Sequence, residues 1–352
     1  MRVMKNPGYH LSNFVSASFF LVLLILMTNL CNAQSTPKRS LLALSKTNHT
    51  LAIVDPATLN IIVRIPVGED PHEVVASSDG KTAYVCIYGG GSFYELNVID
   101  LVAQKPLVNI DTRPLYGPHD ITFVNGKAWF TAEGSKSVGR YDPATGKMDW
   151  SMGTGQDRTH MIYVAADGKK IYTTNVSSGT VSIIVDSLMQ PGRMAPPGAK
   201  PREEWMQTVV PVSRGCEGFD VSPDGVELWT ASSEDGTIFI VDPVAKKLKA
   251  KIDAKVSGAN RVKFTPDGKM VFISSLQTGD LAIYNAQTHT EIKRLKLGRG
   301  AAGILMDPEG SRAFVACSAD NYIAVIDLRT LEVTKHLDVG GVPDGLAWAV
   351  QR

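Results

Sequence analysis

Three histidines in this sequence occupy equivalent places in consecutive repeats of the chain. His72, His119 and His160 each stand at the start of an apolar segment that opens a new repeat. Neutral imidazoles are good ligands for divalent transition metals, and they can move protons near neutral pH. The common register therefore predicts that the three side chains converge on one point, where they could hold a metal ion or act as general acid and base.

The same register carries polar side chains in most of the other repeats. The seven positions are His72, His119, His160, Glu217, Asn260, Ala302 and Asp344. We consider His72, His119, His160 and Glu217 as candidates for catalysis and for binding one divalent metal ion, because imidazoles with a carboxylate form a suitable donor set. A structural explanation is also open, since duplication copies residues and a Pro-His pair can simply hydrogen-bond the loop that enters each repeat.

Other polar residues close to this register favour an anionic ligand. The predicted ligand-binding residues are Glu133, Arg158, Asn175, Arg214, Asn260, Arg299 and Asp344. Arginine and histidine side chains gathered at one opening favour a carboxylate or phosphate group. The alternative is that the arginines pair with neighbouring acidic residues or backbone carbonyls.

Short apolar segments recur along the chain at steps of 42 to 56 residues, and each ends in Asp or Asn. They end at Asp55, Asp100, Asp142, Asp186, Asp242, Asn285 and Asp327. Most are preceded by an aromatic-led strand and, before that, by a turn pair such as Asp79-Gly80 or Asn125-Gly126. Asp-Gly and Asn-Gly favour the positive φ angles of a two-residue hairpin. Each repeat is therefore predicted to form four antiparallel strands, a to d, as in one blade of a β-propeller.

Two fragments at the ends of the chain complete a seventh repeat. Residues 40–67 supply strands b, c and d, and residues 341–350 supply strand a. Pairing them closes the ring and removes exposed strand edges. We therefore predict an all-β, seven-bladed β-propeller, in which the innermost strands carry the candidate residues to one mouth of the central channel. Residues 187–204, rich in Pro and Gly, predict a loop inserted between strands c and d of one blade.

Specific segments resemble the repeats of the YVTN family of bacterial propellers. The resemblance is carried by Tyr172-Thr173-Thr174-Asn175, by Tyr84-Val85 and by Ser222-Pro223-Asp224-Gly225, and it extends over the chain after residue 33. It implies a scaffold rather than an activity. The wider superfamily includes surface-layer proteins, lactone-hydrolysing enzymes, an antibiotic-cleaving lyase and the propeller domains of copper and quinone enzymes, so function must be argued from the site.

Residues 1–33 have the pattern of a signal peptide. Arg2 and Lys5 precede an apolar run, and Cys31-Asn32-Ala33 offers small residues for cleavage. We therefore expect a mature chain of residues 34–352, periplasmic or secreted, with no transmembrane segment. It would contain 34 basic and 35 acidic residues, a balance that gives no electrostatic reason to expect nucleic acid as a partner.

Several catalytic and cofactor motifs are missing from the sequence. It has no CxxCH motif, so a covalently bound c-type haem is not expected, and it has no GxSxG, HExxH or phosphate-binding loop. Three functions stay open for what we expect to be a monomer. These are binding of a small anionic ligand, with or without a metal; lactonase-like or lyase-like catalysis by the His/Glu cluster; and docking of a protein partner at a cell surface.

Overall fold

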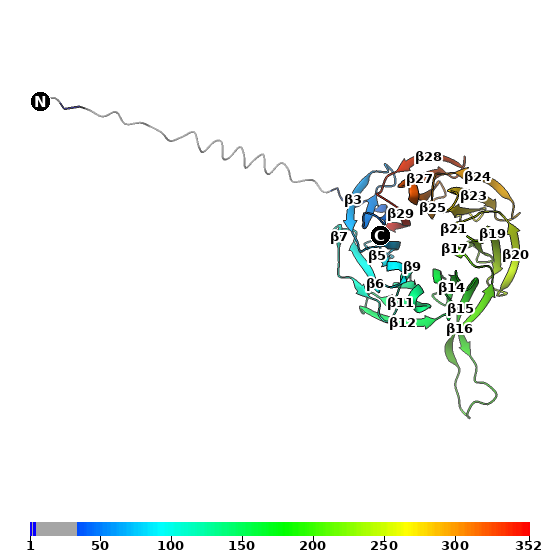
Figure 1. The fold of residues 1–352 in the computed structure, drawn as a ribbon. Coiled ribbons are helices and arrows are strands. Elements are labelled where there is room, and N and C mark those ends of the chain that lie inside the picture. The colour runs from blue at the N-terminus through cyan, green and yellow to red at the C-terminus, as the bar shows by residue number, and fades with distance from the viewer. Residues whose placement is uncertain (2, 5–33) are drawn as a thin grey trace. The chain divides into compact units, whose positions relative to one another are not determined.

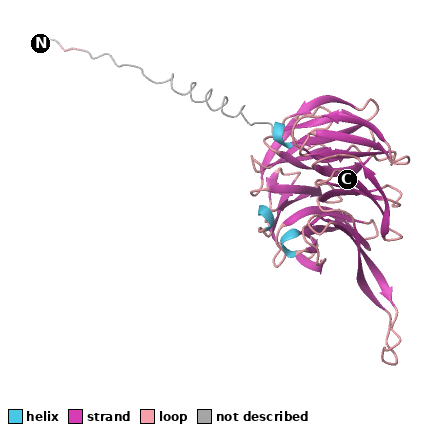
Figure 2. Cartoon of the chain, turned by 45° about the vertical axis from the view of Figure 1, so that its right-hand side comes forward, coloured by secondary structure: helices cyan, strands magenta, loops and turns pink. Residues whose placement is uncertain are grey.

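The computed structural model describes residues 1, 3–4 and 34–352, and residues 36–352 form one compact unit. Most of the predicted signal peptide, residues 1–33, lies outside the described residues. No helix in the described part of the chain is long and apolar enough to cross a membrane. That part is nearly all strand, and its helical turns are η1 (Gly89–Gly91), η2 (Glu133–Ser135) and η3 (Ser318–Asp320), as Figure 2 shows.

Seven antiparallel sheets stand around a central channel like the blades of a propeller (Figure 1). The blade that holds both chain ends consists of β29 (Pro343–Val350), β1 (Arg39–Ser45), β2 (Thr50–Val54) and β3 (Ile61–Pro66). Blade 1 consists of β4 (Pro71–Ala76), β5 (Thr82–Ile87), β6 (Glu95–Asp100), β7 (Lys105–Pro106) and β8 (Ile110–Asp111). Blade 2 consists of β9 (Pro118–Val124), β10 (Lys127–Ala132), β11 (Ser137–Asp142) and β12 (Lys147–Gly153).

The other four blades have the same order from the channel outward. Blade 3 consists of β13 (Thr159–Val164), β14 (Lys170–Asn175), β15 (Thr180–Met189) and β16 (Arg202–Pro211). Blade 4 consists of β17 (Cys216–Val221), β18 (Leu228–Ser232), β19 (Thr237–Asp242) and β20 (Lys247–Asp253). Blade 5 consists of β21 (Ala259–Phe264), β22 (Met270–Ser275), β23 (Asp280–Asn285) and β24 (Glu291–Lys296). Blade 6 consists of β25 (Ala301–Met306), β26 (Arg312–Cys317), β27 (Tyr322–Asp327) and β28 (Glu332–Leu337). The predicted seven-bladed, all-β fold is confirmed.

The turns between the first two strands of the blades differ in detail from the sequence-based expectation. The glycine of each turn pair has a positive φ, but Asn125-Gly126 is the pair in which both residues do. In blade 1 the Gly80 N–H donates to the Ser77 carbonyl at 2.9 Å, so a four-residue turn ends in a left-handed glycine. Both kinds of turn join antiparallel strands, which is why the strand assignment holds although the turn type varies.

The two ends of the chain meet in one blade. Strand β29 runs antiparallel to β1, with Leu41 opposite Trp348 and Ala43 opposite Leu346. The Trp348 indole N–H also donates to the Met306 carbonyl of blade 6 at 2.8 Å. In Figure 1 the C-terminus lies beside β29, inside the ring. The last strand of the chain therefore contacts both its own blade and the blade before it.

Two outer strands depart from the predicted pattern. The insertion at residues 187–204 is not a loop throughout, because Ser187 pairs with Glu204 and Met189 with Arg202, which leaves a shorter loop at the tip of a projecting hairpin (Figure 1). The Pro- and Gly-rich part of the insertion covers only that tip, and its flanks continue the ladder. In blade 1 the outer edge is split into β7 and β8, since Pro106 has no N–H to donate to the sheet.

Hydroxyl groups on the second strands fix the backbone of the next blade at the channel. Thr131 Oγ1 donates to the His160 carbonyl at 2.6 Å, and Ser274 Oγ donates to the Ala302 carbonyl at 2.7 Å. Thr174 makes the same contact with the Glu217 carbonyl. The first two bonds are buried and the third is partly buried, and together they hold three of the register residues in place from the neighbouring blade.

Candidate functional site

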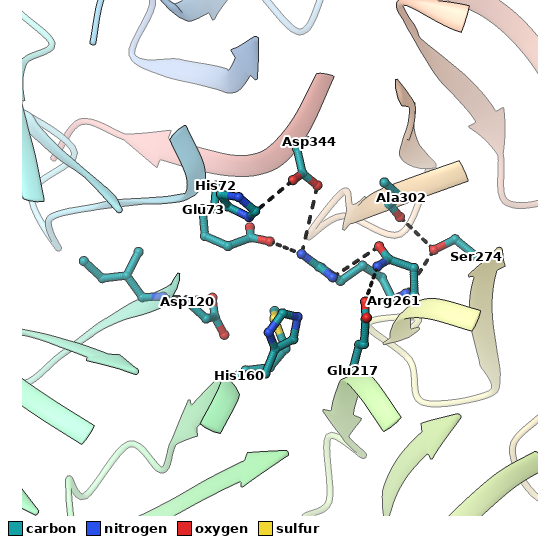
Figure 3. A network of polar contacts seen from close by, with 12 residues as sticks. His72, Glu73, Asp120, His160, Glu217, Arg261, Ser274, Ala302 and Asp344 are labelled. Carbon is teal, nitrogen blue, oxygen red and sulfur yellow. Dashed lines mark hydrogen bonds and ion pairs between the residues drawn. The ribbon is translucent and has the colours of Figure 1, made fainter. Parts of the chain in front are cut away.

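A β-bulge near the start of every innermost strand shapes the channel wall. In blade 1, Pro71 is opposite Ile87 and Val74 is opposite Val85, so three steps on β4 match two steps on β5. The same extra residue is present at this place in the other six blades. A bulge breaks the alternation of side chains between the two faces of a sheet. Two consecutive residues of β4, His72 and Glu73, therefore both reach the channel (Figure 3).

All seven register residues line one cavity of about 250 Å³ at the channel mouth. Its lining consists of Lys46, His72, Tyr88, His119, Arg158, His160, Glu217, Asn260, Arg261, Leu276, Ala302, Ser318, Val342 and Asp344. The seven register positions are therefore brought together at one mouth of the channel. Lys46, Tyr88 and Arg261 also line the cavity and were not predicted from the sequence. The signal for the first two was their place directly after a second strand, which is also the place of Glu133.

Three imidazoles follow one another around one side of the cavity. The ring centroids of His72 and His119 are 4.6 Å apart, and those of His119 and His160 are 3.8 Å apart. His119 is 3% exposed, and its Nδ1 has no hydrogen-bond partner among the described residues. Burial, with the nearby His160 and His72, lowers the pKa of His119 well below its ordinary value. His119 is therefore a neutral imidazole with a free ring nitrogen at physiological pH.

Glu133 lies against this row and is almost fully buried. One carboxylate oxygen contacts His160 Nδ1 and the other accepts a hydrogen bond from the Tyr88 hydroxyl. Burial works against its charge, but His160 and then Tyr88 and Arg158 lower the pKa of Glu133 below its ordinary value. His119, Glu133 and His160 each offer a ligand atom within 4.8 Å of the other two. These three residues are the group, within the described residues, that could hold a metal ion.

The carboxylate of this group is not the one expected from the sequence. Glu217 lies in the cavity, but its Oε2 accepts a hydrogen bond from Asn260 at 2.7 Å. His72 is 3.0 Å from Asp70 Oδ1 and 3.0 Å from Lys46 Nζ. The predicted metal set of His72, His119, His160 and Glu217 is therefore brought to one cavity but not to one point. Glu133 takes the place expected for Glu217, because it directly follows β10 and its carboxylate contacts His160 from there.

A charged network links three blades across the channel. The Arg261 guanidinium reaches across to the Glu73 carboxylate and lies 4.0 Å from Asp344, as Figure 3 shows. Asp344 is in turn 2.8 Å from Lys46 Nζ. Burial raises the pKa of Glu73 although Arg261 opposes it, and Asp344 adds to the rise. If side chains alternated strictly along each strand, Glu73 and Arg261 would point toward the blade interior instead of the channel. Their charge on an otherwise apolar strand was the available sign of the bulge.

The residue two places before each register position has a left-handed backbone in all seven blades. These residues are Asp70 (φ 54°), Gly117 (66°), Arg158 (54°), Gly215 (79°), Gly258 (69°), Gly300 (68°) and Val342 (51°). Glycine adopts this conformation without strain, whereas other residues pay about 1–3 kcal/mol. Blades 1 and 3 therefore place the charged side chains of Asp70 and Arg158 at the mouth in spite of a backbone cost.

Four of the predicted ligand-binding residues lie outside the cavity lining: Glu133, described above, and Asn175, Arg214 and Arg299. Arg299 pairs with Asp320 at 2.7 Å, and Arg214 is largely exposed, 3.9 Å from Glu234. Asn175 is fully buried within blade 3, where it accepts a hydrogen bond from Thr159 and donates one to Ser182. Asn175 is the last residue of β14, so it corresponds to Ala132 rather than to Glu133. Asn175 therefore lies one position earlier in its blade than Glu133 does in blade 2, and its amide fixes the blade instead of facing the channel mouth.

The fold is shared with many solved structures. No protein-family model matches the sequence, and no curated protein matches it. A candidate 6-phosphogluconolactonase from Bacteroides fragilis has a TM-score of 0.70 at 14% identity, over 90% of this chain and 99% of that one. A functionally unknown protein from Desulfotomaculum acetoxidans has a TM-score of 0.69 at 14% identity, over 88% and 98%. The dihydro-heme d1 dehydrogenase NirN has a TM-score of 0.60 at 14% identity, over 90% and 76%. At such identities the likeness concerns the propeller fold.

Proposed function

We propose that this chain is an exported propeller that binds a small anionic ligand in the channel-mouth cavity, with Arg158 as the main cationic contact. The observation that carries the proposal is how the three cations of the cavity are paired. Arg261 is buried against Glu73, and Lys46 is 2.8 Å from Asp344. Arg158 has no such close pair, since its nearest recorded carboxylate oxygens, on Glu133 and Glu217, are 3.6 and 3.9 Å away. Its guanidinium can therefore turn to an incoming anion without breaking a strong pair.

The surroundings of Arg158 support the same proposal. Its side chain is 44% exposed, so solvent reaches it, while the neighbouring His160 is buried. A cavity of about 250 Å³ has room for a small molecule rather than a polymer. The strained left-handed backbone of Arg158 is further support, because such strain is common at functional sites. The proposal of export rests on the signal-peptide pattern of residues 1–33.

The test is calorimetric titration of the mature protein with acetate, lactate, gluconate and inorganic phosphate, in the presence of a chelator. We expect at least one of these anions to bind saturably, and Arg158→Gln to weaken it by about tenfold or more, which is about 1.4 kcal/mol. Arg299→Gln is the matched control, because Arg299 also lies on a loop of a channel-facing strand but pairs with Asp320 outside the cavity. Equal losses in both variants, or no loss in Arg158→Gln, would contradict the proposal.

A second candidate function is hydrolysis of a lactone in the same cavity. The observation that favours it is His119 in the cavity wall, because an imidazole beside a bound substrate can take part in proton transfer. The structural neighbour described as a candidate lactonase is consistent with this chemistry but shares only the fold. The test is proton release from a panel of simple and phosphorylated lactones. Turnover by the wild type that is lost in His119→Gln and kept in His336→Gln supports catalysis, and no turnover of any lactone rejects it for this panel.

A further inference from the structure

We infer that His119, Glu133 and His160 bind one divalent transition-metal ion of the zinc type. The three donors come from adjacent blades, since His119 is on β9, Glu133 follows β10 and His160 is on β13. One ligand atom of each lies within 4.8 Å of the other two. Two imidazoles and one carboxylate are a donor set that zinc and related divalent ions take at sites with an open coordination position.

The first argument is the free nitrogen of His119. Buried polar atoms almost always have a hydrogen-bond partner, because leaving one without a partner is unfavourable. His119 Nδ1 is buried and has no partner among the described residues. A metal ion would therefore satisfy an atom that the protein groups leave unpaired.

The second argument is the support around the other two donors. Glu133 is buried, and its second oxygen accepts a hydrogen bond from Tyr88. Thr131 holds the backbone of His160 through the 2.6 Å bond to its carbonyl. Such outer contacts orient metal ligands and raise their affinity.

The third argument is that the other candidates are engaged elsewhere. His72 contacts Asp70 and Lys46, and Glu217 accepts a hydrogen bond from Asn260. Both line the same cavity, and each shares its residue type with one of the proposed ligands. They are therefore matched controls, because they differ from His119 and Glu133 in position but not in chemistry.

The inference deepens the proposed function and rests on it for one part only. Three protein donors leave at least one coordination position free, and Arg158 lies 3.6 Å from Glu133. A carboxylate ligand could then bind the metal and Arg158 together. Binding of the metal itself requires no anionic ligand, so the two proposals can fail separately.

The experiment is a zinc titration of the mature protein, purified without an affinity tag and stripped with a chelator. The buffer contains no carboxylate or phosphate. We expect one ion per chain, and affinity that falls by about ten- to a hundredfold in His119→Ala and in Glu133→Gln. His72→Ala and Glu217→Gln should bind zinc within about threefold of the wild type, which is less than about 0.7 kcal/mol.

Two outcomes would overturn the inference. One is the absence of saturable zinc binding by the wild type. The other is a loss in His72→Ala or Glu217→Gln as large as the loss in His119→Ala. Circular dichroism of each stripped variant controls for folding. If a ligand variant does not fold, X-ray absorption of the wild-type zinc complex decides instead, because two imidazoles and an oxygen donor must be present. The anion titration proposed above is carried out with a chelator present. The absence of anion binding in that experiment would therefore not contradict zinc binding.

Discussion

The two sides of the channel mouth have the same backbone and different chemistry. Blades 1 to 3 and blades 4 to 6 share the bulge near the start of the first strand and the left-handed residue before it. The first side contributes His72, Tyr88, His119, Glu133, Arg158 and His160. The second side contributes Glu217, Asn260, Arg261, Leu276, Ala302 and Ser318. Most groups that could bind a metal or move a proton are therefore on one side of a near-symmetric ring.

The comparison shows that the repeated backbone fixes where side chains lie at the channel mouth. The residue types at those positions then determine the chemistry of each side. At the left-handed position, blades 4 to 6 have Gly215, Gly258 and Gly300, which fit the backbone without strain. Blades 1 and 3 have Asp70 and Arg158 at the same place. A charged side chain kept where glycine is favoured is a physical reason to look for function on that side.

The largest expected effect comes from removing the strand on which both sides depend. Deleting residues 341–352 removes β29, with Ala347 and Ala349 buried and Trp348 bonded to blade 6. The ring would then be open, and β1 would have an unpaired edge. We expect the thermal midpoint to fall by more than about 10 °C. Scanning calorimetry checks this, and an unchanged midpoint would mean that the two ends do not hold the ring together.

The next largest effect is expected at the left-handed position two residues before each register residue, where substitutions should change stability differently on the two sides. In Gly258→Ala the new Cβ would lie 2.4 Å from the Gln277 Cβ and 2.8 Å from the Gln277 backbone nitrogen, at a φ of 69°. We expect the free energy of unfolding to fall by about 1–3 kcal/mol. Arg158→Gly should leave it unchanged or raise it by up to about 1 kcal/mol, because glycine relieves the strain.

Chemical denaturation of both variants measures this difference. The proposed difference between the two sides would be contradicted if Arg158→Gly lowered the free energy of unfolding as much as Gly258→Ala. Arg158 would then have a structural role. Anion titration of the folded Arg158→Gly protein completes the test. We expect a more stable or equally stable protein that binds the anion less tightly.

The smallest expected effect is a pH dependence on the first side. The hydrogen bond with His72, against some burial, lowers the pKa of Asp70 from 3.8 to about 2. A lowered pKa means that this pair adds stability above about pH 4 and loses it as the pH falls toward 2. Asp70→Asn should therefore be less stable at pH 7 by less than about 1 kcal/mol, because the pair is partly exposed. Denaturation at pH 7, 5 and 3 should show the gap narrowing, and a gap independent of pH would contradict this.

The sequence predicted the ring well because its signals repeat. Seven apolar segments ending in Asp or Asn and six turn pairs placed the blades, and one register placed seven residues in one cavity. It failed where a one-residue change reverses the direction of a side chain. The bulge brought Glu73 and Arg261 to the channel, and the end of β14 put Asn175 inside its blade. Glu133 was predicted as a ligand-binding residue, but its contact with His160 depends on loop geometry that spacing does not contain.

The most direct test of the account is the nuclear magnetic resonance of the histidine rings during titration with the four small anions. The account predicts that an anion which binds will shift the rings of His119, His160 and His72 with one common saturation curve. His289 and His336 are internal controls, because they lie outside the channel-mouth cavity, and His289 lines a different cavity beside Glu227. Shifts centred on His289, or none at His119 and His160 while an anion binds, would contradict the claim that this side of the mouth is the binding site.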